Sequence, residues 1–139
     1  MSYPAAPYPL SSYTRAADFV RLLGERIVIL DGAMGTMIQQ YKLSEDDFRG
    51  ERFQAHHRDL RGNNELLSLV RPDIIETIHR QYLEAGADVI CTNTFGATVV
   101  AQGDYELYDI GYELNLASAR LARKACDEFN AKGESRYVA

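Results

Sequence analysis

The stretch that most constrains the fold is residues 26–36, with the sequence RIVILDGAMGT. Four consecutive apolar residues, 27–30, lead directly into Asp31 and Gly32, a pattern typical of a parallel strand that is buried on both faces. In open α/β sheets and in βα barrels, ligands bind beyond the carboxyl ends of the strands. The stretch therefore predicts a buried strand over 27–30 and makes Asp31 the first candidate site residue.

The turn after Asp31 fits two interpretations. Gly32 lets a ligand approach the backbone and Gly35 permits a tight turn into a helix, which favours a binding role for Asp31. Alternatively, Asp31 caps the helix that follows. The turn has neither a Gly-x-Gly-x-x-Gly pattern nor a Walker lysine, so a phosphate-binding loop is disfavoured.

A second strand is predicted over residues 87–96, ADVICTNTFG, and it again ends in polar residues and a glycine. Apolar residues at helical spacing predict a helix between the two strands, opened by Pro72 and closed by Gly86. Two strands joined by such a crossover helix are parallel, so their carboxyl ends face the same side of the sheet. Asp31, Asn93 and Thr94 are therefore expected on one rim.

The remaining elements follow from periodicity and from turn residues. We expect a mobile arm over 1–13, a helix over 14–23 stopped by Gly24, and a helical turn over 37–41. A polar, irregular excursion then runs to about residue 64, held down by Phe48 and Phe53. A long helix follows from about 107 to 132, and a third strand begins at 136. Because the chain ends inside that strand, we expect it to be the front part of a larger domain.

The histidines and cysteines carry no metal signature. His56 and His57 are adjacent and have no third ligand at helical spacing, which disfavours a metal site. His79 lies beside the apolar stripe of the crossover helix and is expected to be packed and hydrogen-bonded. Cys91 and Cys126 are too few for a disulfide framework and too far apart for a Cys-x-x-Cys motif, so both are expected to be free, buried thiols.

Charge and hydropathy exclude several classes of partner. The net charge is −5 with acids and bases interspersed, and no cluster of Lys and Arg offers a footprint for nucleic acid or an acidic membrane. No apolar run approaches the ~20 residues that span a bilayer, and the N-terminus does not resemble a secretory signal. The sequence favours a cytoplasmic protein with no nucleic-acid or membrane partner.

Four segments together resemble a known family. They are LDGAMGT at 30–36, RPD at 71–73, YLEAGAD at 82–88 and TNTF at 92–95, and they resemble the homocysteine-binding domain of S-methyltransferases. The insertion at 41–53, with HRDL at 57–60 and GNN at 62–64, resembles cobalamin-dependent methionine synthases near their N-terminus. The resemblance implies an α/β fold in which residues 14–139 are the N-terminal portion of a (βα)8 TIM-type barrel: two βα units and the start of a third strand.

The resemblance also implies a chemistry. In such enzymes zinc held by three cysteines activates the homocysteine thiol, and methylcobalamin, recharged from 5-methyltetrahydrofolate, supplies the methyl group. Those cysteines lie on later strands, so this chain is expected to hold neither zinc nor cobalamin, to have no catalytic residue and to be inactive alone. Its partners would be homocysteine, the remaining barrel strands, and the folate and cobalamin modules.

The resemblance assigns substrate-binding roles to five residues of this chain. Asp31 would pair with the homocysteine ammonium group. The backbone N–H groups of Gly32 and Ala33, with Asn93 and Thr94, would meet the carboxylate or line its pocket.

One position departs from the family pattern, and one competing class of function stays open. Cys91 stands where we expect an acid or an aliphatic residue in relatives. It is not expected to bind zinc, because no sulfur partner is near and its side chain alternates away from Thr92. The competing interpretation is a non-catalytic βα module that self-associates or binds another chain through exposed sheet edges.

Overall fold

The computed structural model describes residues 16–139, so the arm expected over 1–13 lies outside the described residues. The α-helices are α1 (Ala16–Glu25), α2 (Met34–Gln39), α3 (Glu45–Arg49), α4 (Leu67–Val70), α5 (Pro72–Glu84), α6 (Val99–Gln102) and α7 (Gly111–Asn130). Two 3-10 turns, η2 (Asn64–Leu66) and η3 (Gly103–Tyr105), precede α4 and follow α6. The strands β1 (Val89–Ile90) and β2 (Tyr137–Val138) are short.

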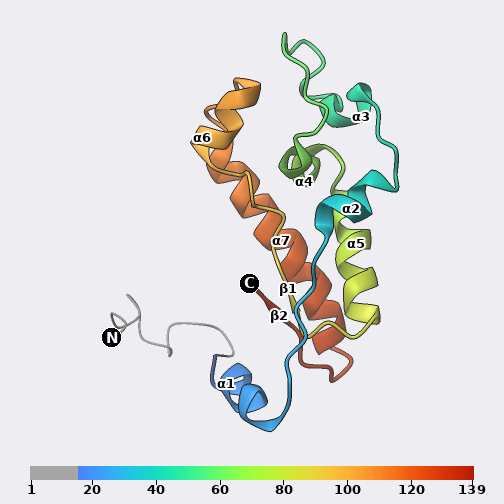
Figure 1. The fold of residues 1–139 in the computed structure, drawn as a ribbon, viewed down its shortest axis with the longest axis vertical. Coiled ribbons are helices and arrows are strands. Elements are labelled where there is room, and N and C mark those ends of the chain that lie inside the picture. The colour runs from blue at the N-terminus through green and yellow to red at the C-terminus, as the bar shows by residue number, and fades with distance from the viewer. Residues whose placement is uncertain (1–15) are drawn as a thin grey trace.

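The strands run parallel, as the crossover helices predict. Val89 pairs with Tyr137 and Ile90 with Val138, while Leu30 forms an isolated parallel bridge to Val89 on the other side. The three segments thus lie side by side in chain order, with β1 in the middle. Figure 1 shows α5 and α7 alongside these segments, α1 at one end, and α3 and α6 toward the other.

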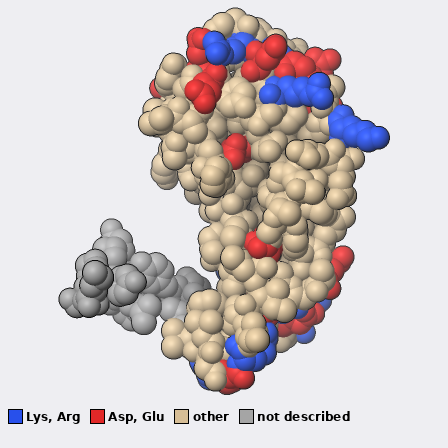
Figure 2. All heavy atoms as spheres, in the orientation of Figure 1, with Lys and Arg blue, Asp and Glu red and all other residues tan. Residues whose placement is uncertain are grey.

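The prediction that residues 27–30 are buried on both faces is wrong for this chain. Ile27, Ile29 and Leu30 are 87%, 55% and 56% exposed, and only Leu30 makes a bridge. The reason is that this segment has β1 as a neighbour on one side, and the described residues leave much of its apolar surface uncovered. On the face of the molecule that Figure 2 shows, charged side chains gather at the two ends and the surface between them is largely uncharged.

Helices α5 and α7 form the main core beside the strands. Pro72 opens α5 as predicted, and Ile74, Ile75, Ile78 and Leu83 are buried along its length. On α7, buried residues recur at helical spacing, from Leu114 through Ala122 and Ala125 to Phe129. The two helices are also joined by ion pairs of Arg80 with Glu128 (2.8 Å) and Lys124 with Glu76 (2.7 Å).

Several predicted boundaries shift for local reasons. Helix α1 continues past Gly24 to Glu25, and α2 begins at Met34, three residues before the predicted turn. The predicted long helix starts at Gly111 rather than near 107, because α6 and η3 occupy residues 99–105 and Glu106 has a left-handed φ of 56°.

The segment over 37–64 is more ordered than its polar composition suggests. Ser44 and Asp47 form a capping box that starts helix α3, in which the Asp47 backbone N–H donates to the Ser44 hydroxyl. Phe48 and Phe53 are buried, which confirms that they hold this segment to the core. The prediction of an irregular excursion is therefore wrong over α3.

His79 on α5 is fully buried, as expected of a histidine beside an apolar stripe. The expectation of a hydrogen bond is wrong, since neither ring nitrogen has a partner among the described residues. Burial lowers the pKa of His79 from 6.5 to about 4, although Glu76 favours the charged form. The imidazole is therefore neutral at pH 7.

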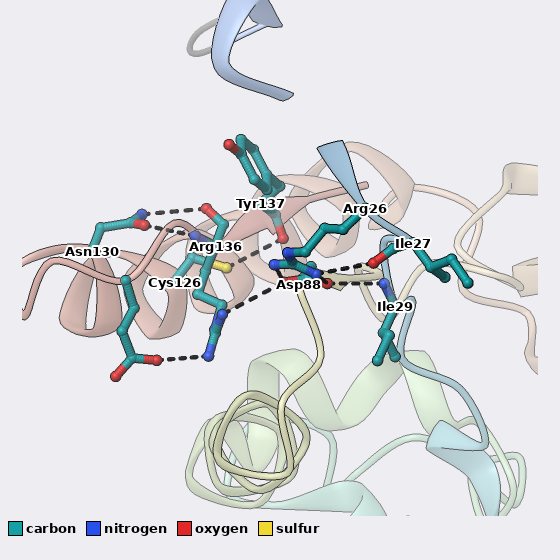
Figure 3. Close-up of polar contacts among 9 residues, drawn as sticks. Arg26, Ile27, Ile29, Asp88, Cys126, Asn130, Arg136 and Tyr137 are labelled. Carbon is teal, nitrogen blue, oxygen red and sulfur yellow. Dashed lines mark hydrogen bonds and ion pairs between the residues drawn. The ribbon is translucent and has the colours of Figure 1, made fainter. Parts of the chain in front are cut away.

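One buried carboxylate ties together the amino ends of all three strand segments (Figure 3). The Asp88 side chain is 2% exposed and accepts two hydrogen bonds from Arg26, at 2.8 and 2.6 Å, and one from the Ile29 backbone N–H at 2.9 Å. Arg136, which directly precedes β2, lies 3.6 Å away. The hydrogen bond from Arg26 holds the pKa of Asp88 below its usual range. These contacts of Asp88 hold the amino ends of the three strand segments together.

Candidate functional site

A cavity of about 200 Å³ lies at the opposite, carboxyl ends of the first two strand segments. It is lined by residues 31–34 and 91–95. All five sequence-predicted site residues, Asp31, Gly32, Ala33, Asn93 and Thr94, belong to this lining. The structure therefore brings together two groups of residues that lie far apart in the sequence, as the parallel arrangement predicts.

Asp31 presents a half-buried carboxylate to this cavity. Its Oδ1 accepts a hydrogen bond from the Cys91 backbone N–H at 3.0 Å, and its own N–H donates to the Val89 carbonyl at 2.9 Å. Burial raises the pKa of Asp31, while hydrogen bonds from the thiol and the N–H of Cys91 act in the opposite direction. Among residues 16–139, no cation lies within ion-pair distance of this carboxylate.

The interpretation of Asp31 as a helix cap is wrong. The N-cap of α2 is Ala33, with a left-handed φ of 45°, and no side chain makes a cap hydrogen bond there. Gly32 is exposed, and a Cβ added to it would meet no atom within 4 Å. The backbone at Gly32 and Ala33 thus borders open space beside the Asp31 carboxylate.

Asn93 and Thr94 take different parts in the wall of the cavity. The Asn93 side-chain amide is turned into the protein, where it donates to the Asn64 carbonyl at 2.8 Å and to the Ser68 hydroxyl at 3.3 Å. The Thr94 hydroxyl shares a 2.8 Å hydrogen bond with the Thr92 hydroxyl. Asn93 therefore fixes the position of the wall, whereas Thr92 and Thr94 offer exchangeable hydroxyl hydrogen bonds.

Cys91 is the site residue that the sequence interpretation missed. It was expected to be buried, but it is partly exposed and lines the cavity next to Asp31. Burial is the main cause that raises the pKa of its thiol to about 11, and the hydrogen bond to Asp31 is the second cause. The sequence feature that could have identified Cys91 as a site residue is its position directly before residues 92–94. Cys126 is buried as expected, and its thiol donates to the Tyr137 carbonyl at 3.3 Å.

The described residues do not form a metal centre. His56 Nε2 lies 2.8 Å from the Tyr105 carbonyl, and His57 Nε2 lies 2.9 Å from the Glu106 carboxylate. Within residues 16–139, no group of three His, Cys, Asp or Glu side chains is placed to hold a metal ion. These residues therefore do not fit a three-cysteine zinc site.

In the same range, no helix has the length and apolar character needed to cross a membrane.

Comparisons with known proteins agree on one family. The family model described as homocysteine S-methyltransferase matches residues 28–139. The solved structure of the homocysteine methyltransferase MmuM from Escherichia coli in its metallated form is similar, with a TM-score of 0.64, 24% sequence identity, and coverage of 86% of this chain and 38% of that chain. Its oxidized form gives a TM-score of 0.62 and 26% identity, covering 85% of this chain and 38% of that chain. This chain thus spans less than two-fifths of the length of these solved structures.

Proposed function

This chain belongs to the homocysteine S-methyltransferase family, and we propose that its cavity at residues 31–34 and 91–95 binds homocysteine for methyl transfer to the substrate thiol. The observation that carries the proposal is the Asp31 carboxylate, which faces the cavity without a cation partner among the described residues. A partly desolvated carboxylate in that state is suited to receive an ammonium group.

The same proposal gives each part of the cavity a task. The ammonium group of homocysteine donates to Asp31, while its carboxylate lies toward the backbone at Gly32 and Ala33 and the hydroxyl of Thr94. Asn93 acts as a positioning residue, because its amide is already engaged with Asn64 and Ser68. Zinc, when bound, would activate the substrate thiol, and its ligands would have to come from outside the described residues.

We further propose that the described elements are the first two βα units and the third strand's start of a (βα)8 barrel. The parallel order of Leu30, β1 and β2, with α5 and α7 in the connections, supports this. The insertion over 41–64 supports a cobalamin-dependent methionine synthase as the specific enzyme, through its resemblance to that group. In that assignment the cobalamin and folate modules act with this domain.

Titration of the chain with L-homocysteine, followed by amide chemical shifts, tests the binding proposal. We expect saturable shifts at Gly32, Ala33 and Thr94. Asp31→Asn should weaken binding roughly tenfold to a hundredfold, since a charge-assisted hydrogen bond contributes about 1.5–3 kcal/mol. Asp46→Asn, which removes a charge from the exposed side of α3, is the matched control.

A second ligand isolates the ammonium contact. 4-Mercaptobutyrate has the thiol and the carboxylate but no amine, so it should bind more weakly and respond little to Asp31→Asn. Equal affinity of the two ligands, or an unchanged homocysteine affinity in Asp31→Asn, would remove Asp31 from substrate recognition.

A further inference from the structure

A second cavity, of about 330 Å³, lies at the other end of α2. Its apolar floor consists of Ile38 and Phe48, both buried, and half-buried Leu43. The rest of its lining is polar: Gln39, Lys42, Arg61, Gly62 and Asn64. A cavity of this size that combines an apolar floor with a few polar groups is typical of small-molecule sites.

The two cations of this cavity differ from most others in the molecule. Most described arginines are held by carboxylates, as Arg49 is by Glu45 at 2.7 Å and Arg52 is by Glu113 at 2.6 Å. Lys42 and Arg61 have no ion pair among residues 16–139. In a chain of net charge −5, two unpaired cations at one cavity create a local attraction for anions.

The Glu45 carboxylate, which contacts the backbone of Arg61, is already engaged. The carboxylate of Glu45 accepts backbone N–H groups from Leu60 at 2.8 Å and from Arg61 at 2.7 Å, in addition to its ion pair with Arg49. These contacts hold the pKa of Glu45 below its usual range against the effect of burial. Glu45 therefore holds the backbone of Arg61, which is one of the residues that line the cavity.

The backbone around the cavity is shaped by two left-handed residues. Lys42, three positions after the end of α2, has a φ of 50°, and Gly62 has a φ of 99° in the turn before η2. Such a conformation is uncommon for a lysine, and both Lys42 and Gly62 belong to the lining of the cavity. The backbone conformation at these two residues therefore shapes this part of the cavity lining.

We propose that this cavity is a binding site for a small organic anion, a carboxylate or phosphate ester that carries an apolar body. The anionic group pairs with Lys42 and Arg61, and the apolar body contacts Ile38, Leu43 and Phe48. The site is separate from the Asp31 cavity. Helix α2 and Asn64 lie between them, because Asn64 lines the second cavity while its carbonyl accepts from Asn93 in the wall of the first.

Amide chemical-shift titrations with defined probes test this proposal. Benzoate represents the carboxylate source, phenyl phosphate the phosphate source, and benzamide is the neutral counterpart of benzoate. We expect saturable shifts at Ile38, Gly62 and Asn64 with an anionic probe, binding about tenfold weaker with benzamide, and weaker binding at higher ionic strength. The anion that binds more tightly shows whether the site prefers a carboxylate or a phosphate ester.

Paired double variants provide the control. Lys42→Asn/Arg61→Gln should abolish the preference for the anion; asparagine is chosen because it tolerates the left-handed conformation at position 42. Arg120→Gln/Lys132→Gln removes the same charge from α7 and the turn after it and should bind the probes as the unaltered chain does. Equal binding of benzamide, equal losses in both double variants, or saturation only by an acidic peptide would overturn the proposal.

The test is independent of the homocysteine proposal. L-Homocysteine added to Lys42→Asn/Arg61→Gln should still shift Gly32 and Ala33. If binding of the anionic probe fails while homocysteine still binds, only the proposal for the second cavity fails. If homocysteine binding fails while the anionic probe still binds, only the proposal for the Asp31 cavity fails.

Discussion

The buried imidazole of His79 should make the stability of this chain sensitive to mild acid. In the folded chain its pKa is about 4, whereas the ordinary value is 6.5. Between these values the unfolded chain binds a proton that the folded chain does not, so the free energy of unfolding falls as the pH decreases below 6.5. One pKa unit corresponds to about 1.4 kcal/mol, so the free energy of unfolding should fall by about 2 kcal/mol between pH 7.0 and 4.5.

Urea unfolding at pH 7.0 and 4.5 measures this loss, and His79→Leu isolates it. Leucine keeps much of the buried volume and removes the two unpartnered nitrogens, so the variant should be at least as stable at pH 7.0. It should then lose about 2 kcal/mol less stability than the unaltered chain on acidification.

His57→Gln is the control, because it removes an imidazole that is 70% exposed rather than buried. If His79→Leu and the unaltered chain lose stability in parallel between pH 7.0 and 4.5, His79 is hydrated or hydrogen-bonded in solution and the reasoning from its burial fails.

Three further outcomes are expected. Asp88→Asn should lower the free energy of unfolding by about 2 kcal/mol in urea titrations, less than for a fully buried pair because Arg26 is half-exposed; an unchanged midpoint would contradict the role of Asp88 in joining the strands. The chain should elute from gel filtration with substoichiometric zinc, and stoichiometric zinc retained against a weak chelator would refute the interpretation of its cysteines. The exposed apolar segment at 27–30 should cause concentration-dependent self-association by light scattering, reduced by Ile27→Lys but not by the equally exposed Val100→Lys; a monomer at every concentration would show that this surface is covered.

The sequence by itself determined the local elements and the side of the sheet on which the candidate site lies. Periodic apolar residues and turn residues such as Pro72 predict α5 and most of α7, because helix formation depends on neighbours three and four positions away. Parallel connections then place Asp31 beside Asn93 and Thr94, since both strands must end at the same rim. These inferences need no knowledge of side-chain contacts.

Only the tertiary structure decided which groups meet and which stay without a partner. The exposure of residues 27–30 depends on how many strands flank them, and the contact of Cys91 with Asp31 joins residues 60 positions apart. The unpartnered ring of His79 depends equally on distant neighbours. The shared cavity of Lys42 and Arg61 results from left-handed turns and from the engagement of Glu45 by backbone N–H groups, neither of which leaves a periodic trace in the sequence. Contacts of this kind form between surfaces that meet only after folding, so their physical cause lies outside any local stretch of the chain.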